Sequence, residues 1–302
     1  MFNLSKFSNK SKIWKEKNSD SEIIYDLTGV PNIDREDFNN LMADNFFKEF
    51  SKQANDMNKN GFCRLEINTI NWMNLVDTLK SELEELEEIK LIDKENPKPI
   101  RFQDAWLHKK INTVRDLAIE PKILQCLKIL YGREPFPFQT LNFPYGSRQH
   151  FHSDAVHFNS LPRGFMCGIW IALEDIHKDS GPLFYYPKSH KLPYISARDL
   201  GLSSQDLNMN KNPQKLFESY WINLVKEKGY VKKQFIAKKG EILIWHANLL
   251  HGGDIVINKN LTRWSQVTHY YFKNCGYFTP MHTTKEFINN LKWREPYNII
   301  EN

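Results

Sequence analysis

Residues 135–173, PFPFQTLNFPYGSRQHFHSDAVHFNSLPRGFMCGIWIAL, decide the fold that we expect for this chain. Two short apolar and aromatic runs, 136–143 and 165–173, flank a loop rich in glycine and polar side chains. Runs of this length between turn residues are typical of strands. Similar runs recur at 183–186, 234–237, 241–245 and 264–272. This spacing predicts a many-stranded β sandwich or barrel.

The first part of the chain is patterned differently. Residues 1–35 are polar and weakly patterned, and we expect a surface arm there. Apolar side chains at helical spacing predict three helices and, over 61–67, one short strand. Pro121 suits the first position of a helix, and Gly132 suits its C-terminal cap. The predicted helices cover residues 36–60, 74–91 and 114–131.

Helices come first and strands later, and no linker separates them. We therefore expect residues 36–302 to form one α+β domain. Within it, residues 36–134 are mainly helical and residues 135–280 form the β core. Residues 191–233 interrupt the strands and contain an amphipathic helix around 216–225. A long insertion in a compact β fold is often a lid or a binding loop.

The bulk composition is that of an ordinary folded protein. Of 302 residues, 41% are apolar and 25% are charged, and the net charge is +5. Lysines are interleaved with acidic residues, which argues against a nucleic-acid partner and fits an anionic small ligand equally well. The 4 cysteines form no CxxC pair, so a zinc ribbon is unsupported. No segment has the apolar length of a signal peptide or a membrane span, so we expect a cytoplasmic protein with no membrane partner.

The first chemical signal is an HSD sequence that contains His152 and Asp154. In an extended segment, side chains two residues apart point to the same side, so this imidazole and this carboxylate can reach one ion. Alone, the pattern is common by chance. A later histidine, His251, stands in the stretch WHANLLHGG. Two histidines and one carboxylate form the facial triad of non-haem Fe(II) oxygenases, which leaves positions open for a 2-oxo acid and O2.

The second signal is Arg263, which follows His251 and begins an apolar run. The planar guanidinium pairs with a carboxylate through two hydrogen bonds. Alone, a surface arginine at a strand edge is the simpler explanation. Together with the triad, Arg263 is the expected anchor for the distal carboxylate of 2-oxoglutarate.

Other histidines compete for the metal. His150 and His152 could be the pair instead, but Asp154 would then lose its natural partner. His246 lies an odd number of residues before His251, and on one strand that spacing sends the two side chains to opposite sides. Pocket positions or ordinary structural contacts are expected for His157, His190 and His269.

The chain resembles the phytanoyl-CoA dioxygenase family over about residues 100–279. The matching stretches occur in the family's order, and their combination is far more specific than any single motif. They are RFQDAW (101–106), QTLNFP (139–144), HSD (152–154), CGIWIALED (167–175), GPLFYYPKSH (181–190), and HGG (251–253) with Arg263. The first 95 or so residues match nothing in the family, and the insertion at 191–233 varies among relatives and is expected to help define the substrate.

The resemblance implies a double-stranded β-helix core, also called a jelly roll or cupin-like fold, with the N-terminal helices packed outside it. It implies Fe(II) as cofactor, 2-oxoglutarate as cosubstrate, and succinate and CO2 as products. The implied metal ligands are His152, Asp154 and His251, and the implied 2-oxoglutarate anchor is Arg263. Residues implied to face the cosubstrate or substrate are Gln139, Asn142 and Trp170, with Arg101 as a further pocket candidate.

The substrate is not implied by the resemblance, because the family includes hydroxylases of amino-acid-like solutes, phosphonates and natural-product intermediates. The carboxylate of Asp154 favours hydroxylation, since related halogenases carry a small residue in its place. The positive charge balance favours a carboxylated or phosphorylated substrate. Two other classes stay open: a non-catalytic jelly-roll protein, and a cupin-like metal isomerase or hydrolase that does not use 2-oxoglutarate. The sequence predicts no oligomeric state.

Overall fold

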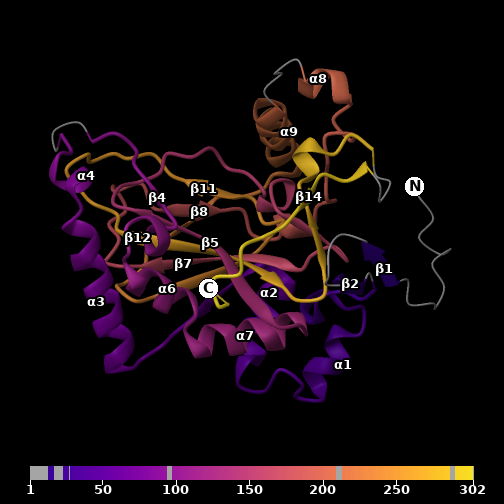
Figure 1. Cartoon of the computed structure of the whole chain (residues 1–302), viewed down its shortest axis with the longest axis horizontal. Helices are drawn as coiled ribbons and strands as arrows, with labels where there is room; N and C mark the ends of the chain where they lie inside the picture. Colours follow the sequence, from indigo (N-terminus) through magenta and orange to yellow (C-terminus); the bar gives the residue numbers. More distant parts are fainter. Residues whose placement is uncertain are drawn as a thin grey trace.

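The computed structural model of the chain describes residues 13–16, 23–26, 28–93, 97–208, 213–285 and 290–301. Two antiparallel sheets face each other (Figure 1). The larger sheet has the strand order β3 (Phe62–Leu65), β10 (Ile242–His246), β7 (Met166–Ala172), β12 (Ser265–Phe272), β5 (Pro135–Phe143) and β4 (Phe102–Gln103). The smaller sheet has the order β11 (His251–Gly253), β8 (Leu183–Tyr185) and β9 (Lys233–Phe235).

Helices from the first part of the chain cover the outer face of the larger sheet (Figure 1). They are α1 (Phe38–Ala43), α2 (Ser51–Asn60), α3 (Ile70–Glu84), α4 (Glu87–Lys90), α5 (Ala105–His108), α6 (Asn112–Ala118) and α7 (Pro121–Tyr131). Two more helices, α8 (Ser204–Asn208) and α9 (Pro213–Lys228), lie on the other side, above the smaller sheet. No helix in the described ranges is both long enough and apolar enough to span a membrane.

The side chains of β7 alternate between the two faces of the larger sheet, and both faces are covered by other parts of the protein. Cys167, Ile169 and Ile171 pack against the helices, whereas Trp170 and Ala172 face the smaller sheet. Because side chains alternate along a strand, a sheet covered on both sides has an unbroken apolar sequence. This is the origin of the run CGIWIAL that first indicated a strand.

Short strands complete the fold. β13 (Gly276–Phe278) lies between β14 (Trp293–Arg294) and β6 (Asn159–Leu161), and β1 (Ile13–Glu16) pairs with β2 (Ile23–Asp26). The sequence analysis predicted none of these five strands, which are 2 to 4 residues long. The six longer apolar runs were placed correctly to within about two residues, which is the usual uncertainty of a boundary.

The helical predictions need three corrections. Residues 36–60 form two helices, α1 and α2, with a 3-10 turn between them. The helix predicted over 74–91 begins earlier, where the Thr69 side chain accepts a hydrogen bond from Trp72 N, and it breaks at Leu86 before α4. The helix predicted over 114–131 is divided into α6 and α7, because Pro121 starts a new helix. Gly132 caps α7 in the left-handed conformation, as expected.

The surface arm expected over residues 1–35 lies largely outside the described residues, but residues 31–33 are buried. Ile33 is fully buried in the core against helices α2 and α7, although the arm was expected to extend to residue 35. The Asn58 side chain in α2 donates a hydrogen bond to Ile33 O, which fixes this segment. The sequence pattern did not indicate this packing, because one apolar side chain among polar neighbours has no periodicity.

A substitution at Gly61 tests the packing of the end of α2 against His190, which lies in the loop after β8. It ends α2 in the left-handed conformation, and a Cβ there would lie 2.5 Å from His190 Nδ1. We expect Gly61→Ala to lower the free energy of unfolding in chemical denaturation by about 1–2 kcal/mol for the backbone conformation, and by about 1–3 kcal/mol more for the overlap.

Gly229→Ala is the matched control, because Gly229 has φ +64° and a Cβ added there would meet no atom within 4 Å. It should show only the backbone contribution. Equal losses of stability in the two variants would mean that His190 does not pack against the end of α2.

Candidate active site

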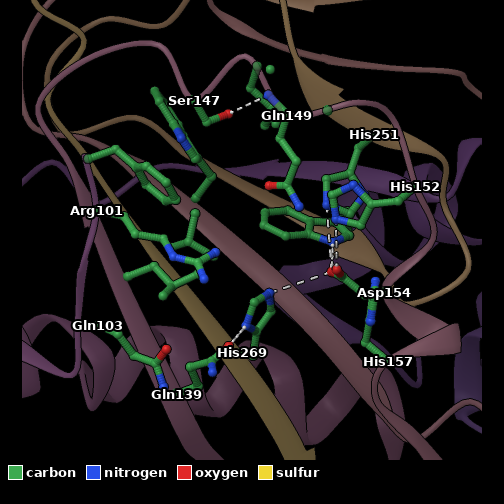
Figure 2. Close-up of a pocket in the computed structure, with 18 of the residues that line it drawn as sticks. Arg101, Gln103, Gln139, Ser147, Gln149, His152, Asp154, His157, His251 and His269 are labelled. Carbon is green, nitrogen blue, oxygen red and sulfur yellow. Dashed lines mark hydrogen bonds and ion pairs between the residues drawn. The ribbon is translucent and has the colours of Figure 1, made fainter. Parts of the chain in front are cut away.

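A cavity of about 300 Å³ opens between the two sheets (Figure 2). Its walls come from the inner faces of β5, β7, β10 and β12, from β8 and β11 of the smaller sheet, and from the loop that follows β5. The residues that matter most for its chemistry are Arg101, Gln103, Gln139, His152, Asp154, His157, Trp170, Trp245, His251, Arg263 and His269.

His152, Asp154 and His251 meet at one end of the cavity. All three are buried, and one ligand atom from each lies within 4.8 Å of the others. Two backbone hydrogen bonds join the histidines across the sheets, from His152 N to His251 O (2.9 Å) and from His251 N to His152 O (3.0 Å). Two segments far apart in the sequence are therefore held in register, and the three side chains converge on one point.

Backbone carbonyls orient both imidazoles. His152 Nδ1 lies 3.0 Å from His150 O, and His251 Nδ1 lies 3.0 Å from Leu249 O. A carbonyl oxygen can only accept, so each Nδ1 carries the proton and each neutral ring presents the lone pair of Nε2 to the centre. This arrangement is characteristic of metal-binding histidines.

The electrostatics of the centre favour a cation. Burial opposes ionisation of Asp154, but the nearby imidazoles of His251, His269 and His152 outweigh it, so the pKa of Asp154 is well below its usual range. Burial also opposes protonation of His152, yet Asp154 outweighs it and raises the pKa of His152. Burial lowers the pKa of His251 to about 4, so this ring is neutral near pH 7. An ionised carboxylate beside imidazole lone pairs is a suitable site for a divalent metal.

Gly252 and Gly253 allow β11 to approach the loop that carries His152. A Cβ on Gly252 would lie 2.9 Å from Gln149 O, and a Cβ on Gly253 would overlap the Ser147 side chain. Only glycine permits this contact of backbone with backbone. The HGG sequence is therefore explained by packing as well as by its histidine.

Arg263 lies in a second polar region of the same cavity. Its side chain is 2% exposed, and its carbon Cζ lies 5.8 Å from the centre of the Trp170 ring. Its Nη2 donates one long hydrogen bond, 3.4 Å, to Tyr145 O. The nearest acid, Glu174, is bonded to Lys80 and to Trp264 N instead. Burial lowers the pKa of Arg263 to about 10, so it remains a cation at neutral pH.

Two buried donors in this region have no acceptor among the described residues, Arg263 Nε and Trp170 Nε1. A buried unpaired donor costs about 1–3 kcal/mol, so such groups are rare without a reason. A carboxylate bound beside Arg263 would supply the acceptor that its Nε lacks. The residues present therefore fit a dianionic 2-oxo acid that extends from the triad to Arg263.

The structure brings most of the predicted site residues together. Gln139, Trp170 and Arg101 line the cavity with the triad and Arg263. Asn142 does not: it is fully buried on the other face of β5 and donates to Gln266 Oε1 (3.1 Å). Its predicted position was wrong because Gln139 and Asn142 are three residues apart, so they point to opposite faces of one strand.

The competing histidines are placed elsewhere or in other roles. His150 is not among the residues that line the cavity. His246 lies in β10 rather than on one strand with His251, and its Nε2 is 3.3 Å from Asp34 Oδ2. His190 makes the expected structural contact, with its Nε2 near Asn58 O (3.1 Å). His157 lines the cavity, and burial lowers its pKa to about 4.

Two further residues contact the triad: Trp245, which the sequence analysis missed, and His269, which it expected in the pocket or in a structural contact. Trp245 Nε1 donates to Asp154 Oδ2 (2.8 Å). His269 lies between Asp154 and Gln139, with Nε2 3.6 Å from Asp154 Oδ2 and Nδ1 3.0 Å from Gln139 Oε1. Trp245 stands in a buried strand where an aromatic residue is ordinarily core, so only the three-dimensional contact reveals it.

The insertion at 191–233 does not line the cavity in any of its described residues. Instead, Phe217 and Trp221 of α9 are buried against Phe184 of β8 and against Val156, just after the triad carboxylate. A role as a lid or binding loop stays a prediction. In the described residues, the insertion packs beside the segment that carries Asp154.

Two antiparallel sheets around a buried His-Asp-His cluster are the architecture of jelly-roll metalloenzymes, and comparison with known proteins agrees. The phytanoyl-CoA dioxygenase (PhyH) sequence profile matches residues 57–259, so the chain belongs to this family. Membership confirms the expected class, an iron- and 2-oxoglutarate-dependent enzyme. A search of the curated proteins finds no match.

Solved structures confirm the expected jelly-roll fold. EctD from S. alaskensis, crystallised with 2-oxoglutarate and 5-hydroxyectoine, has a TM-score of 0.58 and 17% identity, covering 96% of this chain and 97% of that chain. The carbocyclase SnoK from nogalamycin biosynthesis has a TM-score of 0.56 and 14% identity, covering 82% and 92%. The epimerase SnoN, solved with Fe3+, alpha ketoglutarate and nogalamycin RO, has a TM-score of 0.56 and 16% identity, covering 82% and 95%.

Proposed function

We propose that this protein is a dioxygenase that hydroxylates a small molecule while 2-oxoglutarate is converted to succinate and CO2. The observation that carries the proposal is the pairing, in one cavity, of the buried His152, Asp154 and His251 cluster with the buried, unpaired cation Arg263. A metal site alone would suit many reactions. A metal site with a carboxylate anchor suits a 2-oxo acid cosubstrate.

In this proposal each residue has one task. His152 and His251 present Nε2 lone pairs, and Asp154 supplies the negative charge, to hold Fe(II). Arg263 and Trp170 bind the distal carboxylate of 2-oxoglutarate. When bound, iron and 2-oxoglutarate together supply the oxidation of a C–H bond by O2, with one oxygen atom going to succinate and one to the substrate. Apolar walls, including Leu141 and Val267, limit water in the cavity.

Related structures include a carbocyclase and an epimerase, so the outcome of the reaction needs its own test. Asp154 occupies the carboxylate position that halogenating relatives lack, which argues against halogenation, and we choose hydroxylation as the outcome to test first. Under 18O2, the product should gain one labelled oxygen atom. A product of unchanged mass would point to epimerisation, and a loss of two hydrogens would point to ring formation.

We also propose that the substrate is anionic. Arg101 and Gln103 flank Phe102 in an extended segment, and Gln103 pairs with Leu141, whose side chain lines the cavity. Cross-strand partners share a face, so Arg101 and Gln103 project into the cavity beside Gln139, across from the triad (Figure 2). Arg101 has no ion pair with any described residue, and Asp154 is the only acid in the cavity wall. A carboxylate or phosphate of the substrate would pair with Arg101.

The metal assignment predicts a contrast between neighbouring histidines. His152→Ala should abolish stoichiometric Fe(II) binding in anaerobic calorimetry, because it removes one of three ligands. His150→Ala should bind Fe(II) like the wild type. His150 accepts the hydrogen bond from His152 Nδ1 through its backbone carbonyl, which alanine also has. Loss of binding in both variants, or in His150→Ala alone, would favour the alternative ligand pair.

Arg263→Ala should chiefly weaken 2-oxoglutarate binding to the Fe(II) protein, by about 2–5 kcal/mol, because a buried charge pair is broken. Fe(II) affinity should be unchanged. The measurement is anaerobic calorimetry with 2-oxoglutarate after iron loading. Unchanged 2-oxoglutarate affinity would refute the anchor role and favour a metal isomerase or hydrolase.

The substrate proposal predicts which compounds stimulate turnover. In a screen of matched carboxylates, phosphonates and their neutral amides or esters, the anions should stimulate succinate release in the wild type. Arg101→Gln should lose most of that preference, by about 10-fold or more if one charge-assisted bond is removed, while Arg101→Lys keeps part of it. Stimulation by neutral compounds alone would contradict the proposal.

A further inference from the structure

The two oxygens of Asp154 are not equivalent. Oδ2 accepts a hydrogen bond of 2.8 Å from Trp245 Nε1, in a fully buried pair. Oδ1 lies 3.4 Å from His152 Nε2. Because His152 Nδ1 donates to a backbone carbonyl, the neutral ring has a lone pair rather than a proton at Nε2. Each oxygen therefore lies beside one triad imidazole, Oδ1 beside His152 and Oδ2 beside His251, but only Oδ2 accepts a short hydrogen bond.

The indole is held in place by its own strand and by the next one. Trp245 in β10 is paired directly with Gly168 in β7. A Cβ on Gly168 would overlap the Trp245 ring, so the ring lies across the glycine. The ring centre also lies 4.7 Å from that of His251. Glycine at 168 is thus required by the position of the indole.

Two other groups near Oδ2 do not replace the indole. His251 Nε2 and His269 Nε2 each lie 3.6 Å from Oδ2, which is beyond the length of a strong hydrogen bond. His251 directs its Nε2 lone pair to the centre. Trp245 therefore provides the one short bond to Asp154 Oδ2 among the described residues.

We propose that Trp245 is a positioning residue that restricts Asp154 to one metal-binding oxygen, Oδ1, with Gly168 providing the space for its indole. This inference rests on the proposed function, since it concerns the same metal centre. A carboxylate with two free oxygens can bind a metal through both and occupy one of the positions needed by the cosubstrate and O2. Partners behind a metal ligand commonly change metal affinity or activity 10–100-fold when removed.

The test uses Co(II) as the probe, because its visible absorption reports coordination number and needs no turnover. Trp245→Phe keeps an aromatic ring, but it removes the N–H and leaves a smaller side chain. The control variant below shares this loss of volume. We expect its Co(II) Kd to rise about 10-fold or more. We also expect its absorption to shift toward a more highly coordinated ion, and 2-oxoglutarate to bind the Co(II) form more weakly.

Trp72→Phe is the matched control. Trp72 is also buried, and its Nε1 donates to Gly240 O (3.0 Å) on the helical side of the sheet. Its removal costs a similar buried bond but should leave Co(II) affinity and absorption unchanged. Gly168→Ala is a second route to the same effect, because it displaces the indole without deleting it, and it should reproduce the altered absorption.

The possible results distinguish a failure of the Trp245 proposal from a failure of the proposed function. If wild type binds Co(II) and both Trp245→Phe and Gly168→Ala match it in Kd and absorption, Trp245 only fills space and this inference is wrong, while the proposed function stands. If Trp72→Phe shifts the absorption as much as Trp245→Phe, the effect is general loss of packing and the inference is again wrong. If wild type binds no metal, the proposed function itself fails.

Discussion

The rest of the structure depends on burying one ionised carboxylate, Asp154, between two sheets. A charge removed from water is costly unless it is paired and hydrogen-bonded. The fold meets this demand with one donor, Trp245, and with imidazoles from two distant segments, joined by backbone hydrogen bonds between His152 and His251. The glycines at 168, 252 and 253 remove side chains where the segments would otherwise collide. A bound cation would complete the neutralisation.

The same cavity separates its charges in a way that orients a ligand. Asp154 and the imidazoles lie at the metal end. Arg263 lies among aromatic rings, and its Nε and Trp170 Nε1 have no acceptor among the described residues. A dicarboxylic 2-oxo acid has groups for both regions. Arg101 then remains for a second anion, which is why cosubstrate and substrate can be assigned different cations within a space of about 300 Å³. Electrostatics of this kind position ligands more than they strengthen the fold.

Much of this could be predicted from the sequence, because the signals were strong and local. Strands β5, β7, β8, β9, β10 and β12 follow from short apolar runs, and the triad follows from residue types whose joint chemistry is specific. The alternation of side chains along a strand would also have excluded Asn142 from the cavity. Once Gln139 faces the cavity, a residue three positions later faces the other side of the sheet. Burial of Ile33 and the break at Leu86 depend on tertiary packing, which no local pattern encodes.

Trp245 could not be found in this way, because an aromatic residue in a buried strand has the same appearance whether it packs or positions a ligand. The insertion at 191–233 is similar: its length suggests a lid, which stays a prediction, whereas the packing of its buried aromatics beside the triad loop is seen only in the structure. Function in this fold is therefore determined by contacts between segments far apart in the chain. The sequence identifies the residues predicted to bind the metal, and only the structure identifies the side chains, such as Trp245, that position them.

The most direct test of the central claim is to add Fe(II) and then 2-oxoglutarate to the anaerobic protein and to record the visible spectrum. The proposed function predicts a weak charge-transfer band, which appears only when 2-oxoglutarate chelates iron that is held by the triad. Iron binding without the band would contradict the use of 2-oxoglutarate, and the absence of iron binding would contradict the metal centre itself.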